Sequence, residues 1–171
     1  MTKKLLTRGF TLIELMVTLA IAAIMLGYAL PSFNNFVDQR NMTSRINDFV
    51  LAVNYARSEA IKIGGLVSIQ AIDAADAGNE WGPGYCVVVG NPGNCNGTPL
   101  RIFAGFDDAT VNGVNGFNNF DTFSFNSRGL LGAGVSGELQ LCTTDVDIDP
   151  GRTIFVNMIG RASVSELICH P

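Results

Sequence analysis

The sequence predicts an α+β protein in which a long N-terminal helix packs on an antiparallel β-sheet domain. Apolar residues recur at helical spacing over the first third of the chain, and after Gly64-Gly65 their period falls to two residues. No helical pattern returns beyond these glycines. A helix followed only by strands is typical of the α+β class.

The chain opens with a basic leader, residues 1–9, which is followed by an apolar segment, residues 10–30. This segment is about as long as a helix that crosses a hydrocarbon core of ~30 Å, so we expect a transmembrane helix. Basic residues precede the segment, and the next one is Arg40. The positive-inside rule therefore predicts a single pass, with a cytoplasmic N-terminus and the C-terminal domain across the membrane.

Glu14 is the one charged residue of the apolar segment. A carboxylate at a bilayer centre costs about 2.5–3.5 kcal/mol on insertion scales, so its presence needs a reason. It is tolerated where an opposite charge neutralises it, and the alternative is a side chain that reaches the headgroups. Cleavage as an ordinary secretory signal is a further alternative, but this apolar run is too long and leads directly into helical sequence.

Residues 31–63 form the amphipathic half of the expected helix, which starts near Thr11 and stops at Gly64-Gly65. The residues of its expected core face are Phe33, Phe36, Val37, Ile46, Phe49, Val50, Val53, Ala56, Ala60 and Ile61.

Residues 64–171 form the β-sheet domain, in which turn residues separate short runs of period two. The expected strands are Leu66–Ile72, Tyr85–Val89, Leu100–Phe106, Thr122–Phe125, Glu138–Cys142, Arg152–Ile159 and Ala162–Ile168. Two segments rich in turn-forming residues, Asp73–Pro83 and Asp107–Asn119, are expected to be exposed loops.

The stretch RGFTLIEL resembles the signal of type IV pilins and of type II secretion pseudopilins. The resemblance implies that prepilin peptidase cuts between Gly9 and Phe10 and that Phe10 becomes N-methylated. It also implies that Glu14 is the carboxylate of filament assembly, and Pro31 lies where many pilins bend. In a filament, Glu14 of one subunit would pair with the new amine of Phe10 in the next.

Four later blocks resemble the FimT/GspH family of FimT- and FimU-like minor pilins and type II secretion minor pseudopilins: NYARSEAIKIGG, EWGPGYCVVV, FNSRGLLGAGVSGELQLC and RTIFVNMIGRASV. This resemblance implies a type IV pilin-like fold and a minor pilin of the bacterial inner membrane. Its helix would join other pilins in a type IV pilus, whose assembly it primes or supports. The alternative is minor pseudopilin H of a type II secretion system, with a DNA-binding minor pilin for natural transformation ranked lower.

The DNA-binding alternative depends on arginines near the C-terminus. Some FimT proteins carry a GRxR motif there, whereas this chain has Gly160-Arg161-Ala162-Ser163 and lacks the second arginine. The candidate DNA-binding residues are Arg128, Arg152 and Arg161. Formal charge is −4, and losing three of the 11 basic residues with the leader leaves eight against 15 acidic ones. An acidic domain of this kind does not favour nucleic acid.

Four cysteines, Cys86, Cys95, Cys142 and Cys169, lie in the domain expected outside the cytoplasm, where disulfides persist. Four cysteines allow three pairings. We favour Cys86 with Cys95, which closes a short loop, and Cys142 with Cys169, which ties the end of the chain to an earlier strand. Free buried thiols are the alternative, and no pair has the C-x₂-C spacing of a zinc site.

No cofactor, metal site or catalytic set is expected, and the chain is not expected to be an enzyme. Asp145, Asp147 and Asp149 imitate the start of a calcium loop, but the turn glycine and the bidentate glutamate are misplaced, so we interpret them as an acidic turn. His170 is the single histidine and is expected to be an exposed terminal residue. The sequence therefore points to assembly as the function.

Overall fold

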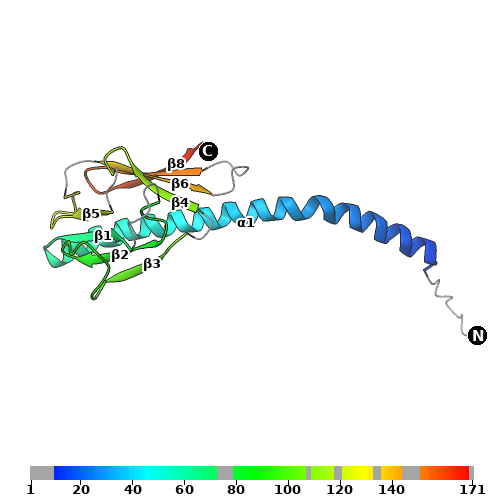
Figure 1. Ribbon diagram of the computed structural model, residues 1–171, viewed down its shortest axis with the longest axis horizontal. Helices are drawn as coiled ribbons and strands as arrows, with labels where there is room; N and C mark the ends of the chain where they lie inside the picture. Colours follow the sequence, from blue (N-terminus) through cyan, green and yellow to red (C-terminus); the bar gives the residue numbers. More distant parts are fainter. Residues whose placement is uncertain are drawn as a thin grey trace, which may run out of the picture. The chain divides into compact units, whose positions relative to one another are not determined.

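The computed structural model describes residues 10–72, 79–106, 109–117, 121–132, 136–143 and 151–169, apart from the side chains of residues 28–32, 34, 35, 38 and 143. The chain divides into two compact units, Met1–Asn41 and Met42–Pro171. One helix, α1 (Leu12–Ile63), begins in the first unit and ends in the second, and the strands follow it (Figure 1).

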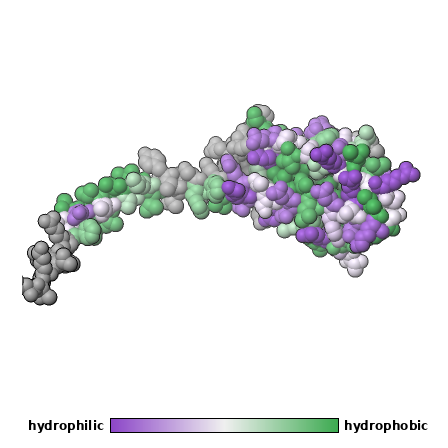
Figure 2. Space-filling model, turned by 180° about the vertical axis from the view of Figure 1, so that it is seen from behind, coloured by the Kyte–Doolittle hydropathy of each residue, from purple (hydrophilic) through white to green (hydrophobic). Residues whose placement is uncertain are grey.

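The first unit contains the apolar part of α1. Every described side chain from Phe10 to Gly27 is exposed, including those of Leu12 at 78% and Ile24 at 64% (Figure 2). The helix continues past Pro31 without a break. Among the residues that the structure describes, no helix is both long and apolar enough for a membrane crossing. The expected span, residues 10–30, ends on side chains outside the described ones and stays a prediction.

The helix ends where the two glycines predict. Gly64 has φ of 64°, which a residue without a Cβ adopts at little cost. Its N–H donates to the carbonyl of Ile61 at 3.3 Å, and the N–H of Gly65 donates to the carbonyl of Ala60 at 3.2 Å. These two bonds form a Schellman motif, which satisfies carbonyls that the end of a helix leaves free.

Two antiparallel sheets form the rest of the second unit, where the sequence led us to expect one. The strands are β1 (Val67–Ala71), β2 (Gly84–Val89), β3 (Arg101–Ala104), β4 (Ala109–Val114), β5 (Thr122–Phe125), β6 (Gly137–Thr143), β7 (Gly151–Val156) and β8 (Ala162–Leu167). The first sheet has the order β3-β2-β1-β5 and the second the order β4-β6-β7-β8. Every strand pair is antiparallel.

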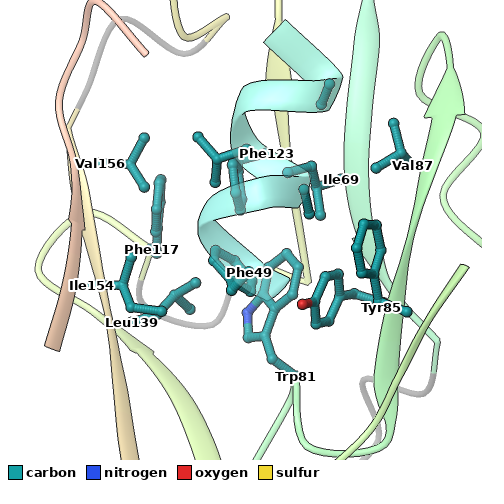
Figure 3. Packing of buried hydrophobic residues seen from close by; sticks show 14 of the residues in the cluster. Phe49, Ile69, Trp81, Tyr85, Val87, Phe117, Phe123, Leu139, Ile154 and Val156 are labelled. Atoms are coloured by element: carbon teal, nitrogen blue, oxygen red, sulfur yellow. The ribbon is translucent and has the colours of Figure 1, made fainter. Parts of the chain in front are cut away.

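The core of this unit lies where one face of α1 packs between the two sheets. Figure 3 shows Phe49 with Leu139 and Ile154 of the second sheet on one side and Tyr85 of the first on the other. The ring of Phe49 lies 4.9 Å from that of Tyr85 and 5.9 Å from that of Trp81. Burying one such side chain stabilises the fold by roughly 1.5–3 kcal/mol. The buried residues of this helix face are Met42, Ile46, Phe49, Ala52, Val53, Ala56 and Ala60.

The expectation of an exposed loop over Asp107–Asn119 is wrong for most of its length. Strand β4 lies inside it and pairs with β6, because Val111 alternates with polar neighbours and fills the core. Phe117 is also buried, at 4% exposure. The density of Asn and Gly reflects the turn at Asn115-Gly116, where Asn115 has a positive φ of 46°.

Residues 73–78 of the second expected loop, Asp73–Pro83, lie outside the described residues, and most of the remainder is buried. Glu80 and Trp81 are buried, and the N–H of Trp81 donates to the carbonyl of Val111 at 3.2 Å. The chain does turn here, as expected, but the indole of Trp81 is part of the core.

The expected core face of α1 also needs correction. Phe33, Phe36 and Val37 are exposed at 63%, 52% and 36%, and Ile61 at 52%. Phe36 instead has the guanidinium of Arg40 over its ring at 4.9 Å. The part of the face from Met42 to Ala60 is buried within the second unit, whereas Ile61 lies in the last turn of the helix and is half exposed.

Candidate functional site

The N-terminal motif forms a capping box at the start of α1. The N–H of Glu14 donates to Thr11 Oγ1 at 3.3 Å, and the N–H of Thr11 donates to Glu14 Oε2 at 3.5 Å. This reciprocal pair satisfies two of the four N–H groups that a helix start leaves free, although both bonds are long. The spacing Thr-x-x-Glu is the sequence signal for this cap, a local role for Glu14 in addition to those expected from the sequence.

Glu14 nevertheless keeps most of its hydrogen-bonding capacity for another partner. Its side chain is exposed, and no ion pair to it exists among the residues that the structure describes. A carboxylate has two oxygens with about four acceptor sites, and the capping box occupies one. Phe10, the expected new N-terminus, precedes the cap by one residue and is 83% exposed. Gly9 lies outside the described residues.

The structure brings two of the three candidate arginines to one end of the second unit. Arg128 and Arg161 are exposed, each beside a glycine, and a Cβ added to Gly160 would lie 2.7 Å from the carbonyl oxygen of Gly129. The two turns therefore touch. Arg57 of α1 is the third arginine at this place, because its side chain lies about 3.1 Å from the Cβ position of either glycine. In the sequence, Arg57 reads only as a polar residue of the helix surface.

Arg152 lies away from this pair of turns. It is at the start of β7, whereas the turns meet beyond the end of that strand, and strand residues advance by about 3.3 Å each. Its Nη2 atom forms an ion pair with Glu166 Oε1 at 3.7 Å across β7 and β8. The three arginines proposed from the sequence thus do not form one cluster.

Both cysteine pairings favoured from the sequence are present. Cys86 is bonded to Cys95, with Cα atoms 5.9 Å apart, and Cys142 to Cys169, with Cα atoms 5.8 Å apart. The described part of the chain contains no free cysteine. The disulfide between Cys86 and Cys95 holds residues 90–99 against the face of β1 that points away from α1. On this face Gln70 Nε2 donates to Asn91 Oδ1 at 2.7 Å.

Among the described residues, no group of three or more metal-ligating side chains comes together. The acidic turn with Asp145, Asp147 and Asp149 lies outside the described residues, as does His170.

A family model described as type II transport protein GspH matches residues 45–160. The chain belongs to the GspH family. A second model, the prokaryotic N-terminal methylation motif, matches residues 6–30. The GspH match covers the helix end and most of the β domain, and the methylation match covers the end of the leader and the capping box. The family and the motif together indicate membrane-anchored assembly of a pilus or pseudopilus.

Solved structures of pilin-type proteins have a similar fold. The type IV minor pilin FimU of Pseudomonas aeruginosa is 25% identical with a TM-score of 0.62, over 76% of this chain and 92% of that chain. A second crystal form of FimU is 26% identical with a TM-score of 0.59, over 72% and 91%. The minor pseudopilin EpsH of the Vibrio cholerae type 2 secretion system is 11% identical with a TM-score of 0.50, over 74% and 95%. No curated protein matches the sequence.

These findings make this GspH family member a minor pilin or pseudopilin with the α+β fold of type IV pilins. The family and its structural neighbours are pilin components and not enzymes. The expected family and fold class are confirmed.

Proposed function

We propose that this protein is a type IV pilus minor pilin that primes or supports pilus assembly. Prepilin peptidase cuts the leader between Gly9 and Phe10, and Phe10 is N-methylated. The helix anchors the chain in the inner membrane with its N-terminus in the cytoplasm and the β domain in the periplasm. It then joins other pilins through residues 10–30, and no catalysis is involved.

The observation that carries this proposal is the exposed apolar part of α1. From Phe10 to Gly27 every described side chain is exposed, although most are apolar. An apolar surface of this extent needs a partner, which is either lipid or the helices of other subunits. The methylation motif, which matches the same residues, supports a helix that moves from the lipid bilayer into contact with the helices of other subunits.

Within the filament, Glu14 is the residue that pairs with the Phe10 amine of a neighbouring subunit. A carboxylate in an apolar assembly is strongly favoured beside a cation and costly without one. The same residue caps its own helix, so two roles must be separated experimentally. Glu14→Gln retains an acceptor for the capping box, whereas Glu14→Ala removes both the acceptor and the charge.

The test measures the amount of each variant in sheared filaments relative to the membrane fraction. If the ion pair drives assembly, both variants are lost from filaments to a similar extent. Intact mass must show correct removal of the leader in each. A Glu14→Gln variant that enters filaments as the wild type does would reject the ion pair and leave Glu14 with the capping role alone.

The choice of a pilus over a secretion system is supported by the FimU structures, which resemble this chain more than EpsH does. Deletion of the gene is expected to reduce surface pili and twitching. Exoproteins that accumulate in the periplasm while pili remain would instead assign the chain to a type II secretion pseudopilus, which is the alternative function. Neighbouring genes for pilus or secretion components provide an independent check.

A further inference from the structure

Three segments distant in sequence meet at the end of the β domain where α1 stops. They are the last turns of α1, the turn after β5 and the turn between β7 and β8, which Figure 1 shows at the same end of the domain. The N–H of Leu131 donates to the carbonyl of Met158 at 3.0 Å, which joins the two turns. A Cβ on Gly129 would lie 2.8 Å from Ile61 Cδ1, which places the helix beside them.

The surface that these segments form, here called the helix-end surface, exposes large apolar side chains. Ile61 is 52% exposed, Leu130 36%, Met158 56% and Ile159 57%. Each segment contributes at least one of them. Single exposed apolar residues are normal, but a group drawn from three adjoining segments is the kind of surface found at interaction sites.

The same surface carries the three arginines, in a domain that is otherwise acidic. Arg128 and Arg161 are exposed beside the two touching glycines, and the side chain of Arg57 extends from α1 to both glycines. The Nε atom of Arg57 is buried and has no hydrogen-bond partner among the described groups. Lys62 in the last turn of α1 is neutralised by Glu59 at 3.2 Å, so the arginines set the sign of this surface.

We infer that the helix-end surface docks an acidic face of a neighbouring pilin-type subunit. Apolar groups rimmed by arginine are typical of protein interfaces, in which aromatic residues, Met and Arg are enriched over Lys. Charge complementarity selects the partner, because an acidic rim meets three guanidinium groups and an apolar centre covers Ile61 and Met158. The family match, which ends at Gly160, includes all three segments up to that residue.

This inference rests on the proposed function, since it names a partner within the assembly that the helix enters. It differs from DNA binding in one physical respect. Phosphate contacts need cations alone, whereas a protein face also removes the four apolar side chains from water.

The test is photocrosslinking of the full chain in its native membranes. A benzophenone amino acid replaces Met158, and in a control strain it replaces Ile102, which is 61% exposed on β3. The expected product contains a second protein that carries an N-terminal methylation motif, and it forms from position 158 only. Arg128→Glu and Arg161→Glu should each lower its yield by about tenfold, because like charges then face each other. Arg101→Glu, an exposed arginine on β3, should leave it unchanged.

Absence of a pilin-type product from position 158 would overturn the inference. So would a yield that falls equally with Arg101→Glu, or variants that impair only a duplex DNA mobility shift. Leader removal and filament content are measured in the same membranes. If the leader is removed and the chain is present in filaments but no crosslink forms, the docking surface alone is rejected. If the leader is not removed, the proposed function is rejected and this inference with it.

Discussion

Gly151, at the start of β7, is the residue that lets the second disulfide cross the sheet. A Cβ at this position would overlap Cys169 Sγ and lie 2.8 Å from the carbonyl oxygen of Leu141. Gly151→Ala should therefore displace the bond between Cys142 and Cys169 and lower the free energy of unfolding by about 1–3 kcal/mol, as overpacking does. Chemical denaturation, with alkylation to count free thiols, measures both effects.

A double-mutant cycle provides the control for Gly151. In a chain with both Cys142→Ser and Cys169→Ser, the added methyl group no longer meets a disulfide, so most of the cost should disappear. An unchanged cost would place the strain at the backbone of β6 and not at the sulfur.

Tyr85 makes stability sensitive to alkaline pH. Burial raises the pKa of its hydroxyl well above the ordinary value of about 10, and the negative charge of Asp48 raises the pKa further. The unfolded chain ionises near the ordinary value while the folded chain stays protonated. Stability is thus fully present below pH about 10 and is lost as the pH rises beyond it. Unfolding measured at a series of alkaline pH values should show a smaller decline in Tyr85→Phe.

The end of α1 provides a matched pair of glycines for a test at the level of the element. Gly64 has a positive φ and nothing within 4 Å of an added Cβ, whereas Gly65 has no positive φ and meets only Ile63 at 3.6 Å. Gly64→Ala should cost about 1–2 kcal/mol through backbone conformation alone. Gly65→Ala should change stability by no more than about 0.5 kcal/mol. Equal effects, measured by thermal unfolding, would contradict the assigned C-cap.

The sequence predicts long or strongly patterned elements well and misses those whose signal depends on tertiary contacts. The glycine stop of α1 and seven of the strands follow from local period and turn chemistry. Local patterning does not predict strand β4, because Asn112 and Gly113 lie within it, and the strand is held by pairing with β6 and by the N–H of Trp81, which donates to the carbonyl of Val111. The helix-end surface cannot be predicted from local patterning for a related reason, because Arg57 meets the two turns only in the folded chain.

At the scale of the whole molecule, the described core lies within the second compact unit, which joins the last part of α1 to the two sheets. Among the residues that the structure describes, every buried core residue lies between Met42 and Val156. Both disulfides are inside it as well. None of the described residues of the first unit belongs to this core. The proposed assembly role uses that unit's apolar part of α1, so we expect stability of the second unit and incorporation into a filament to be separable.

The two disulfides should stabilise this domain unequally, because they close loops of different length. The sequence separations are nine residues for Cys86–Cys95 and 27 for Cys142–Cys169. Loop-closure entropy predicts losses of about 2.7 and about 3.6 kcal/mol when each pair is replaced by serine. Denaturant unfolding of the two double variants in a chain from Met42 to Pro171 measures the difference. The reverse order would mean that native contacts of residues 90–99, such as the bond from Gln70 to Asn91, contribute more than the entropy of the unfolded chain.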